Sequence, residues 1–325
     1  QTFGFSNTER TKFDGETEKY KKIFNNWTDI SELTDLETLN TIRSHDIEVL
    51  IHLGGLFDRS RIAVIKNRAA PVQISWMNMN TTGVKNMDYL IADKNLIKKE
   101  EERYYSEKII YMPNIWNIHS GFRENKLNDS YKEIKLDKEI TFGSFNNFDK
   151  LSDKVILVWS KILKNIKNSK LILRSSNNIK KEYTYSRFKE FNIHEKIEIQ
   201  DHIEDQLVHL ISYNKIDIAL DTFPTPGITT TFEALWMGVP VIIMKGFNLC
   251  SRPGESIMKN LNMEELICEN DEDYVSKAIE LSNNINDLNL IRKKIYYEAK
   301  NSRLFDYQIF NKEFENLILK INKKK

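Results

Sequence analysis

The residues best suited to chemistry lie between residues 221 and 240, in the run DTFPTPGITTTFEALWMGVP. Thr229, Thr230 and Thr231 offer hydroxyl groups at the predicted start of a helix, and Glu233 follows them. A helix start presents backbone N–H groups that have no intrahelical partner, at the positive end of the helix dipole. The run therefore predicts an anion-binding helix start with a carboxylate beside it.

A strand and a turn must position this helix start. Residues 216–220 form a short apolar run of strand type, and residues 223–227 hold two prolines and a glycine, which end it. Phe232, Leu235 and Trp236 then have the apolar spacing of a short helix that stops near Gly238 and Pro240. We expect a buried strand, a loop and a helix start, in that order.

Glu233 also has a simpler interpretation. Thr230 and Glu233 stand in the S/T-x-x-E spacing of a capping box, in which the glutamate only satisfies the backbone at the helix start. The residues of this run by themselves leave both roles open.

Short apolar runs alternate with amphipathic stretches along most of the chain, which predicts parallel sheets with crossover helices. The predicted strands are residues 48–53, 72–75, 89–92, 108–111, 140–145, 170–174, 196–199, 216–220 and 239–243. The predicted helices are residues 153–166, 179–191, 206–213, 252–261, 272–283, 287–300 and 303–322. The polar stretch 114–137 is the expected linker between domains, and residues 323–325 an expected solvated tail.

Composition narrows the class of protein. A length of 325 residues with 40% hydrophobic content suits two compact domains. The formal net charge of +1 gives no field that favours nucleic acid or an anionic membrane. Two cysteines without C-x-x-C spacing make a disulfide framework or a zinc site improbable, and no apolar run is long enough to cross a membrane. We expect a cytoplasmic protein.

Several blocks resemble, in the same order, the catalytic region of the O-linked N-acetylglucosamine transferase family, which includes Spindly-like and bacterial members. They are RAAPVQISWM, MDYLIAD, YSEKIIYMP, FGSFNNFDKL, the run from residue 221 and LFDYQIF. The resemblance implies an α/β fold with two Rossmann-like domains facing across a cleft, of the GT-B type. It places a partial N-terminal acceptor-side domain at 1–125, a UDP-sugar-binding domain at 126–302 and a C-terminal helix packing back on the first domain at 303–325.

Members of this family carry tetratricopeptide repeats ahead of the catalytic region. No repeat of that period occurs here, and the chain begins at Gln1. The resemblance also begins partway into the first Rossmann-like domain. We therefore expect an N-terminally truncated piece of a longer protein, with its first domain incomplete.

The resemblance implies an inverting transfer of a sugar, most often N-acetylglucosamine, from a UDP-sugar to Ser or Thr hydroxyls of a protein acceptor. Charge that develops on the leaving diphosphate must then be stabilised. Lys150 matches the lysine that neutralises the leaving phosphate. Five further residues match the family's UDP-sugar-binding positions. Asn147 matches a polar residue near the phosphates, and His209 matches a histidine beside the uracil. Thr229 and Thr230 match the paired threonines that hold the diphosphate, and Glu233 matches the carboxylate that binds the ribose.

Three positions depart from the family pattern. Ile228 stands where the family has a histidine that contacts the donor, Gln206 replaces a lysine and Ser212 an arginine. The polar loop at residues 78–83 has Asn and Thr where glycines are usual, so the acceptor site is expected to differ. No catalytic base can be assigned, because His45, His52 and His119 do not fall on matching positions.

Alternatives remain open on this evidence. The donor could be UDP-glucose, the acceptor a non-protein glycan, or the chain an inactive pseudo-enzyme that binds a sugar nucleotide or a partner. A UDP-N-acetylglucosamine epimerase would need carboxylate acid–base pairs that do not stand at matching positions. Residues 271–273 form a D-x-D, but they precede a predicted helix and are read as its N-terminal turn. We expect no metal and no cofactor, and neither nucleic acid nor a membrane as partner.

Overall fold

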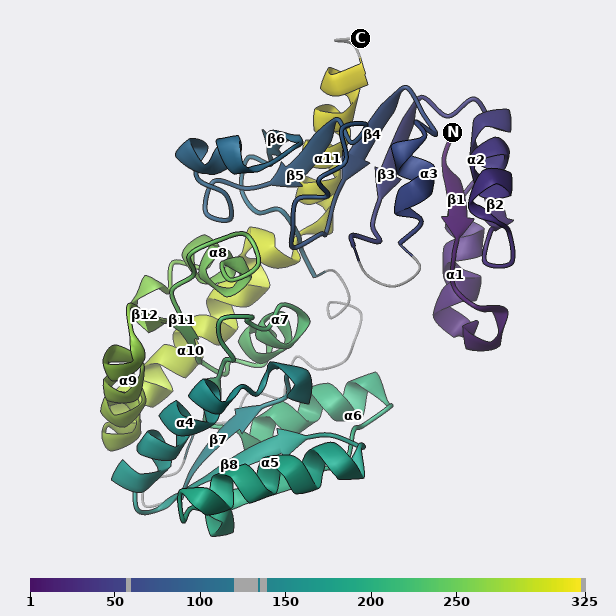
Figure 1. Cartoon of the computed structure of the whole chain (residues 1–325). Helices are drawn as coiled ribbons and strands as arrows, with labels where there is room; N and C mark the ends of the chain where they lie inside the picture. Colours follow the sequence, from purple (N-terminus) through teal and green to yellow (C-terminus); the bar gives the residue numbers. More distant parts are fainter. Residues whose placement is uncertain (57–59, 120–133, 135–138, 323–325) are drawn as a thin grey trace. The chain divides into compact units, whose positions relative to one another are not determined.

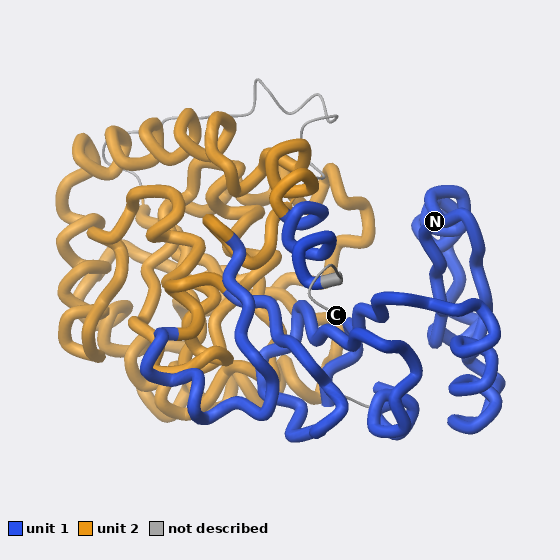
Figure 2. Tube along the Cα trace, turned by 90° about the horizontal axis from the view of Figure 1, so that it is seen from above, with its two compact units in different colours: residues 1–92, 98–112, 314–325 blue, residues 93–97, 113–313 orange. Residues whose placement is uncertain are grey.

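The computed structural model describes residues 1–56, 60–119, 134 and 139–322 (Figure 1). The chain divides into two compact units, shown in Figure 2. Unit 1 comprises Gln1–Ala92, Lys98–Met112 and Phe314–Lys325, and unit 2 comprises Asp93–Ile97 and Pro113–Glu313. Most of the predicted linker, and the predicted tail, lie outside the described residues.

Unit 1 contains a four-stranded parallel sheet in the order β3-β4-β5-β6 and a separate parallel pair, β1-β2. The four-stranded sheet confirms the four strands predicted in this part of the chain. The pair before it was not predicted, because its sequences, FGFS and NWTD, are not apolar runs. The strands are β1 Phe3–Ser6, β2 Asn26–Asp29, β3 Val49–His52, β4 Val72–Ser75, β5 Tyr89–Ala92 and β6 Lys108–Tyr111.

Three helices of unit 1 precede β4, and the last helix of the chain ends in this unit. Leu39, Ile42, Val64 and Ala69 form a buried cluster between α2 and α3. Phe314, in the part of α11 that belongs to unit 1, stacks on Trp76 with 4.5 Å between ring centroids. The helices are α1 Gly15–Ile23, α2 Asp35–Ser44, α3 Ile62–Lys66 and α11 Tyr307–Asn322.

Unit 2 is built on a six-stranded parallel sheet in the order β9-β8-β7-β10-β11-β12. Numbered from β7, this is the 3-2-1-4-5-6 order of a doubly wound fold, in which the chain reverses direction across the sheet between the first and fourth strands. Here these strands are β7 and β10. The strands are β7 Ile140–Ser144, β8 Ser169–Arg174, β9 Ile197–Gln200, β10 Ile218–Leu220, β11 Val241–Met244 and β12 Ile267–Cys268.

The helices predicted for this part of the chain are confirmed, with small shifts at their ends. Helix α4 illustrates the cause: Ser152 caps it by accepting from the Val155 N–H at 3.3 Å, and one side of it buries Trp159 and Leu163 completely. The helices are α4 Asp153–Asn165, α5 Asn178–Glu190, α6 Gln206–Ile211, α7 Thr229–Trp236, α8 Pro253–Asn260, α9 Asp271–Asn283 and α10 Ile285–Asn301.

Small residues allow close packing where β7, β10 and β11 run side by side. Gly143, Ala219 and Val241 are paired in register across these strands, so their side-chain positions share one face of the sheet. A Cβ atom on Gly143 would lie 2.1 Å from Cδ1 of Ile216. The loop that leads into β10 therefore packs directly on β7, and a larger residue at position 143 would displace it.

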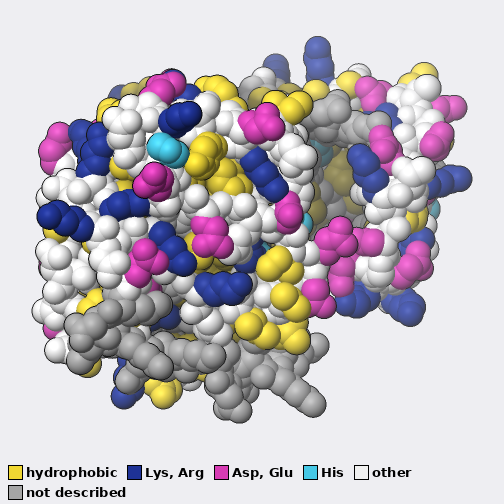
Figure 3. Space-filling view, turned by 90° about the horizontal axis from the view of Figure 1, so that it is seen from below, with side chains coloured by type: hydrophobic (Ala, Val, Ile, Leu, Met, Phe, Trp, Pro, Cys, Tyr) yellow, Lys and Arg dark blue, Asp and Glu magenta, His cyan; other side chains and the backbone are white. Residues whose placement is uncertain are grey.

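The described surface carries charges of both signs. On the face shown in Figure 3, lysine and arginine side chains are interspersed with aspartate and glutamate, in keeping with the net charge of +1. Among the described residues, no helix combines the length and apolar character that crossing a bilayer requires.

Candidate functional site

The candidate site lies at the carboxyl ends of β7 and β10, where the strand order of unit 2 reverses. In open α/β sheets this is the place where ligands bind, because the loops on either side diverge there. The loop after β7 carries Asn146 and Lys150, and the loop after β10 runs from Asp221 to the start of α7. We call Asn146, Asp221, Gly227 and Thr230 the cradle.

Asp221 organises the loop after β10. Its Oδ1 atom accepts hydrogen bonds from the backbone N–H of Thr222 at 2.9 Å and of Gly227 at 2.7 Å, and from Nδ2 of Asn146 at 2.8 Å. Its Oδ2 atom is buried and has no hydrogen-bond partner in the described structure. Burial raises the pKa of Asp221 to about 6, against the opposing effect of these donors and of Lys150.

Asn146 joins the two loops. While its Nδ2 atom donates to Asp221, its Oδ1 atom accepts from the Thr230 hydroxyl at 2.6 Å. Gly227 fits closely against the same atoms, since a Cβ there would lie 2.4 Å from Oγ1 of Thr230 and 2.8 Å from Oδ1 of Asn146. The start of α7 is thus held to the end of β7 by side-chain amide and hydroxyl groups.

The start of α7 differs from the sequence prediction. The N-cap residue is Ile228, whose side chain cannot accept a hydrogen bond, and no side chain caps this end. Thr229, Thr230 and Thr231 are the first turn of the helix itself, so the prediction that they cap it is wrong, and Glu233 takes no part in a capping box. The backbone N–H groups of this turn point into the site without a side-chain acceptor, an arrangement that favours a bound anion.

Lys150 brings a positive charge to the same loop. Its Nζ atom donates to the carbonyl oxygen of Pro226 at 2.7 Å, in the segment between Asp221 and α7. Burial lowers the pKa of Lys150 from its ordinary value, opposed by the negative charge of Asp221. A partly buried ammonium group and an uncapped helix start thus flank one short loop.

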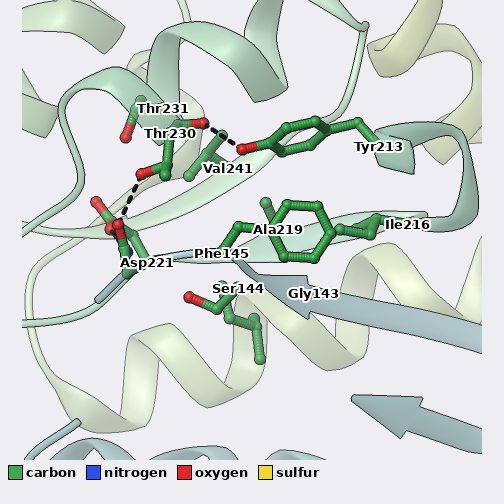
Figure 4. A pocket seen from close by; sticks show the side chains of 12 residues that line it. Gly143, Ser144, Phe145, Tyr213, Ile216, Ala219, Asp221, Thr230, Thr231 and Val241 are labelled. Carbon is green, nitrogen blue, oxygen red and sulfur yellow. Dashed lines mark hydrogen bonds between the residues drawn. The ribbon is translucent and has the colours of Figure 1, made fainter. Parts of the chain in front are cut away.

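Glu233 lies on α7 and is almost fully buried. Its Oε2 atom accepts from the Tyr213 hydroxyl at 2.8 Å and contacts Nε2 of His209 at 3.0 Å. The Tyr213 hydroxyl also lies 3.3 Å from the carbonyl oxygen of Thr230 (Figure 4). Burial is the main cause that raises the pKa of Tyr213 well above 10, with Glu233 adding to it, so this phenol remains a donor.

A small cavity lined by both polar and apolar side chains lies beneath these groups, between the sheet and α7 (Figure 4). Its volume is about 20 Å³, enough for one water molecule. Ser144 Oγ and Asp221 Oδ2 belong to residues that line it, and both atoms are buried without a protein partner in the described structure. The cavity has no room for a ligand much larger than water.

The structure brings most of the predicted site residues to the ends of β7 and β10, and leaves Asn147 at the rim. Lys150, Thr229 and Thr230 stand around the loop after β10, and His209 contacts Glu233 directly. Asn147 is exposed and caps the short turn that follows it, accepting from the Asp149 N–H at 3.0 Å. That role leaves Asn147 at the rim, next to the buried Asn146.

Two of the three departures from the family pattern also have a definite place. Ser212 is buried, and its hydroxyl donates to the carbonyl oxygen of His209. Gln206 is exposed at the start of α6. Neither side chain places a positive charge beside His209.

Four residues of the site were not predicted from the sequence: Asn146, Asp221, Tyr213 and Arg174. Asn146 stands next to the predicted Asn147, and Asp221 begins the run at residues 221–240. Both directly follow predicted strands, which is the position where site residues of such folds lie, so the sequence could have indicated them. Tyr213 and Arg174 gave no such signal, because their contacts with Glu233 and His209 join segments far apart in sequence.

Other polar residues considered as candidates, residues 271–273 and His52, make contacts that stabilise the local structure. Residues 271–273 form the first turn of α9, as predicted, and Asn270 caps it by accepting from the Asp273 N–H at 3.0 Å. In unit 1, His52 Nε2 contacts the carbonyl oxygen of Ser60, and burial lowers the pKa of this histidine. The described residues contain no group of three or more His, Cys, Asp or Glu side chains arranged to hold a metal ion.

Known proteins resemble this chain along most of its length. The model of glycosyl transferase family 41 matches residues 2–125 and 127–314. A probable UDP-N-acetylglucosamine–peptide N-acetylglucosaminyltransferase SPINDLY from Solanum lycopersicum is 27% identical over 329 residues, covering 94% of this chain and 34% of its own length. The chain thus spans about a third of that relative.

Two solved structures share the fold. A mutant of the O-GlcNAc transferase from Thermobaculum terrenum superposes with a TM-score of 0.89 at 26% identity, covering 99% of this chain and 61% of that one. A glycosyltransferase from Rickettsia africae gives a TM-score of 0.60 at 13% identity, covering 99% and 89%, which is a likeness of fold alone.

Proposed function

Because the chain belongs to glycosyl transferase family 41, and is a glycosyltransferase with a GT-B type α/β fold, we propose that unit 2 binds the nucleotide of a UDP-sugar at the ends of β7 and β10. The observation that carries the proposal is the meeting of Lys150 with an uncapped helix start at the point where the strand order reverses. Both favour a diphosphate.

The chemistry follows from where charge develops. When an acceptor attacks the anomeric carbon and the sugar leaves UDP, negative charge builds on the leaving diphosphate. Lys150 neutralises part of that charge, and the backbone N–H groups of Thr229 and Thr230, with the Thr229 hydroxyl, donate to its oxygens. The Lys150 ammonium has three N–H groups, so its bond to the Pro226 carbonyl leaves further donors for a phosphate oxygen.

Glu233 is proposed to hold the ribose. Its Oε2 atom is occupied by Tyr213 and His209, whereas its Oε1 atom accepts no hydrogen bond from the described residues. A carboxylate oxygen of this kind is suited to a ribose hydroxyl. The adjacent His209 and the ring of Phe145, 5.8 Å from it between centroids, are placed to border the base.

We propose N-acetylglucosamine as the sugar and Ser or Thr hydroxyls of a protein as the acceptor. The support is the printed activity of the SPINDLY relative and of the Thermobaculum terrenum enzyme, both of which are longer than this chain. A nucleotide-binding protein without turnover is the second candidate. It is favoured by Ile228, which puts an apolar side chain at the start of α7.

Calorimetric titration with UDP tests the site. Lys150→Ala is expected to weaken binding about tenfold or more, as for loss of a hydrogen bond to a charged group, and Glu233→Ala similarly. Lys161→Ala, at an exposed lysine on α4, is the matched control and is expected to bind as the unaltered chain does. A folded chain that fails to bind UDP would refute the proposed site.

Transfer is tested separately, with radiolabelled UDP-N-acetylglucosamine or UDP-glucose and a protein extract. Label in protein from the first donor alone supports the proposed sugar, and label from the second alone contradicts it. UDP binding that depends on Lys150, without transfer by the full-length protein, would favour the inactive binding protein.

A further inference from the structure

A buried arginine, Arg174, lies at the end of β8, the strand next to β7, and is connected to Glu233 through His209. We propose that Arg174 is a positioning residue of the donor site: it fixes His209 as the tautomer that donates from Nε2, and so holds the Glu233 carboxylate ready for the ribose. The inference rests on the proposed function for its consequence in binding, but the tautomer itself does not depend on it.

Arg174 is the last residue of β8 and is only 5% exposed. Its Nη1 atom lies 2.9 Å from Nδ1 of His209, and its guanidinium group lies 3.9 Å from the centroid of the Phe145 ring. Nη2 lies 3.4 Å from Oε1 of Gln200, at the end of β9. Stacking on Phe145 fixes the plane of the guanidinium and aims one N–H at the imidazole.

The chemistry of the guanidinium determines the state of His209. Arginine nitrogens only donate hydrogen bonds, so Nδ1 of His209 must be the acceptor and carry no proton. The ring proton is then on Nε2, which lies 3.0 Å from Oε2 of Glu233 and donates to it. The opposite tautomer would place two donors against each other at Nδ1 and a lone pair against the carboxylate at Nε2.

The rings around His209 hold this arrangement in place. Tyr213 packs edge-on against His209, with 5.6 Å between centroids and an interplanar angle of 85°, and edge-on against Phe145 at 4.8 Å. Tyr213 also donates to the same carboxylate oxygen as His209. Two donors therefore fix Oε2 of Glu233, and Oε1 is left for a ligand.

The charge of Arg174 supports the same role. Among the described residues, no carboxylate lies within ion-pair distance of its guanidinium, although a buried charge needs compensation. Glu233 is the carboxylate connected to Arg174, with the neutral imidazole between them. Arg174, His209 and Glu233 thus form a chain in which a cation at one end faces an anion at the other.

The test combines a spectroscopic and a binding measurement on this chain. Selective ¹⁵N-histidine labelling, with His209→Gln to assign its signals among the six histidines, reports which ring nitrogen carries the proton. We expect a protonated Nε2 and an unprotonated Nδ1 in the unaltered chain. Arg174→Met keeps an apolar stem over Phe145 but removes the donor, and is expected to give a mixture of tautomers and UDP affinity lower by about tenfold or more.

Controls separate positioning from folding. Arg174→Lys keeps the charge and a donor, and is expected to retain the tautomer and lose less affinity than Arg174→Met. Arg103→Met, at an exposed arginine of unit 1, is expected to change neither measurement. Thermal unfolding followed by circular dichroism shows whether each variant is folded.

Several outcomes would overturn the proposal. A protonated Nδ1 on His209 in the unaltered chain does so without any variant. A folded Arg174→Met variant that keeps the original tautomer and a UDP affinity within about twofold of the unaltered chain also overturns it. The same holds if Arg174→Met and Arg174→Lys lose equal UDP affinity and neither changes the tautomer. If the unaltered chain shows the expected tautomer but does not bind UDP, the proposed function fails and the effect of Arg174 on His209 stands.

Discussion

Asp221→Asn tests how the cradle is held together. The substitution keeps the shape of the side chain, and an Asn Oδ1 atom can still accept from Asn146, Thr222 and Gly227. It removes the negative charge, which sits in a buried position where Oδ2 has no partner among the described groups. Because the charged form is the one that burial disfavours, the effect of the substitution must depend on pH.

The magnitude follows from the pKa. Burial raises the pKa of Asp221 from its ordinary value of 3.8 to about 6 in the folded chain. Such a group adds stability below about pH 4 that is lost as the pH rises through about 6, because folding must then bury the ionised form. At 1.36 kcal/mol per pKa unit the whole effect is about 3 kcal/mol, and about 2.5 kcal/mol of it develops between pH 4 and pH 7, because the carboxyl of the unfolded chain is already partly ionised at pH 4.

The expected result concerns the difference between the Asp221→Asn variant and the unaltered chain. The free energy of unfolding of the variant should rise relative to the unaltered chain by about 2.5 kcal/mol between pH 4 and pH 7. Other titrating groups, such as Asp29 with its lowered pKa, cancel in this difference. If the amide nitrogen of Asn at position 221 finds no partner, the free energy of unfolding of the variant falls by the same amount at every pH, so its change with pH is unaffected.

Hydrogen exchange of peptides that cover β10 is the suitable assay, because the two units need not unfold together. In this strand the Ala219 N–H donates to the carbonyl oxygen of Pro240 at 2.8 Å, and its exchange reports opening of unit 2. Asp149→Asn, the same change at an exposed carboxylate, is the control. A difference that stays within about 1 kcal/mol from pH 4 to pH 7 would refute a buried, charge-penalised Asp221.

Three further substitutions probe the contacts around α7. Gly227→Ala places a Cβ 2.4 Å from Oγ1 of Thr230, so we expect about 1–3 kcal/mol of destabilisation and weaker UDP binding. Unchanged stability in urea unfolding and unchanged UDP affinity in calorimetry would contradict this close packing. Asn146→Ala removes the acceptor of the Thr230 hydroxyl and should lower UDP affinity more than Lys161→Ala; equal affinities would argue against the cradle. Tyr213→Phe leaves Glu233 one donor fewer and should cost about 1–3 kcal/mol in thermal unfolding, which an unchanged melting temperature would disprove.

The strands and helices of unit 2 could be predicted because each is a local pattern with a buried side. The apolar spacing of α4 and the breaks around residues 223–227 are readable without knowing any neighbour. The strands β1 and β2 were not predicted because their sequences, FGFS and NWTD, are not apolar runs. Their pairing with each other, 23 residues apart, gives them their stability as strands.

The role of Glu233 shows where local reasoning stops. From sequence, the spacing from Thr230 allowed a capping box as well as a ligand-binding carboxylate. The structure excludes the capping box because Ile228 is the N-cap, and because His209 and Tyr213 reach Glu233 from segments more than 19 residues away. A capping box depends on one turn of helix, whereas these contacts depend on how α6 and the turn at residues 212–215 pack against α7.

The alternation of strands and helices, the family, and the position of a helix start suited to an anion after Leu220 can all be read from the amino-acid sequence. These features depend on backbone propensity and on residues close together in the chain. Three further features emerge from the folded structure alone: Asn146 links that helix start to β7, Asp221 is buried beneath it, and Arg174 contacts His209. The physical reason is that hydrogen bonds and burial between distant segments exist only once the parallel strands have brought their carboxyl ends to one edge of the sheet.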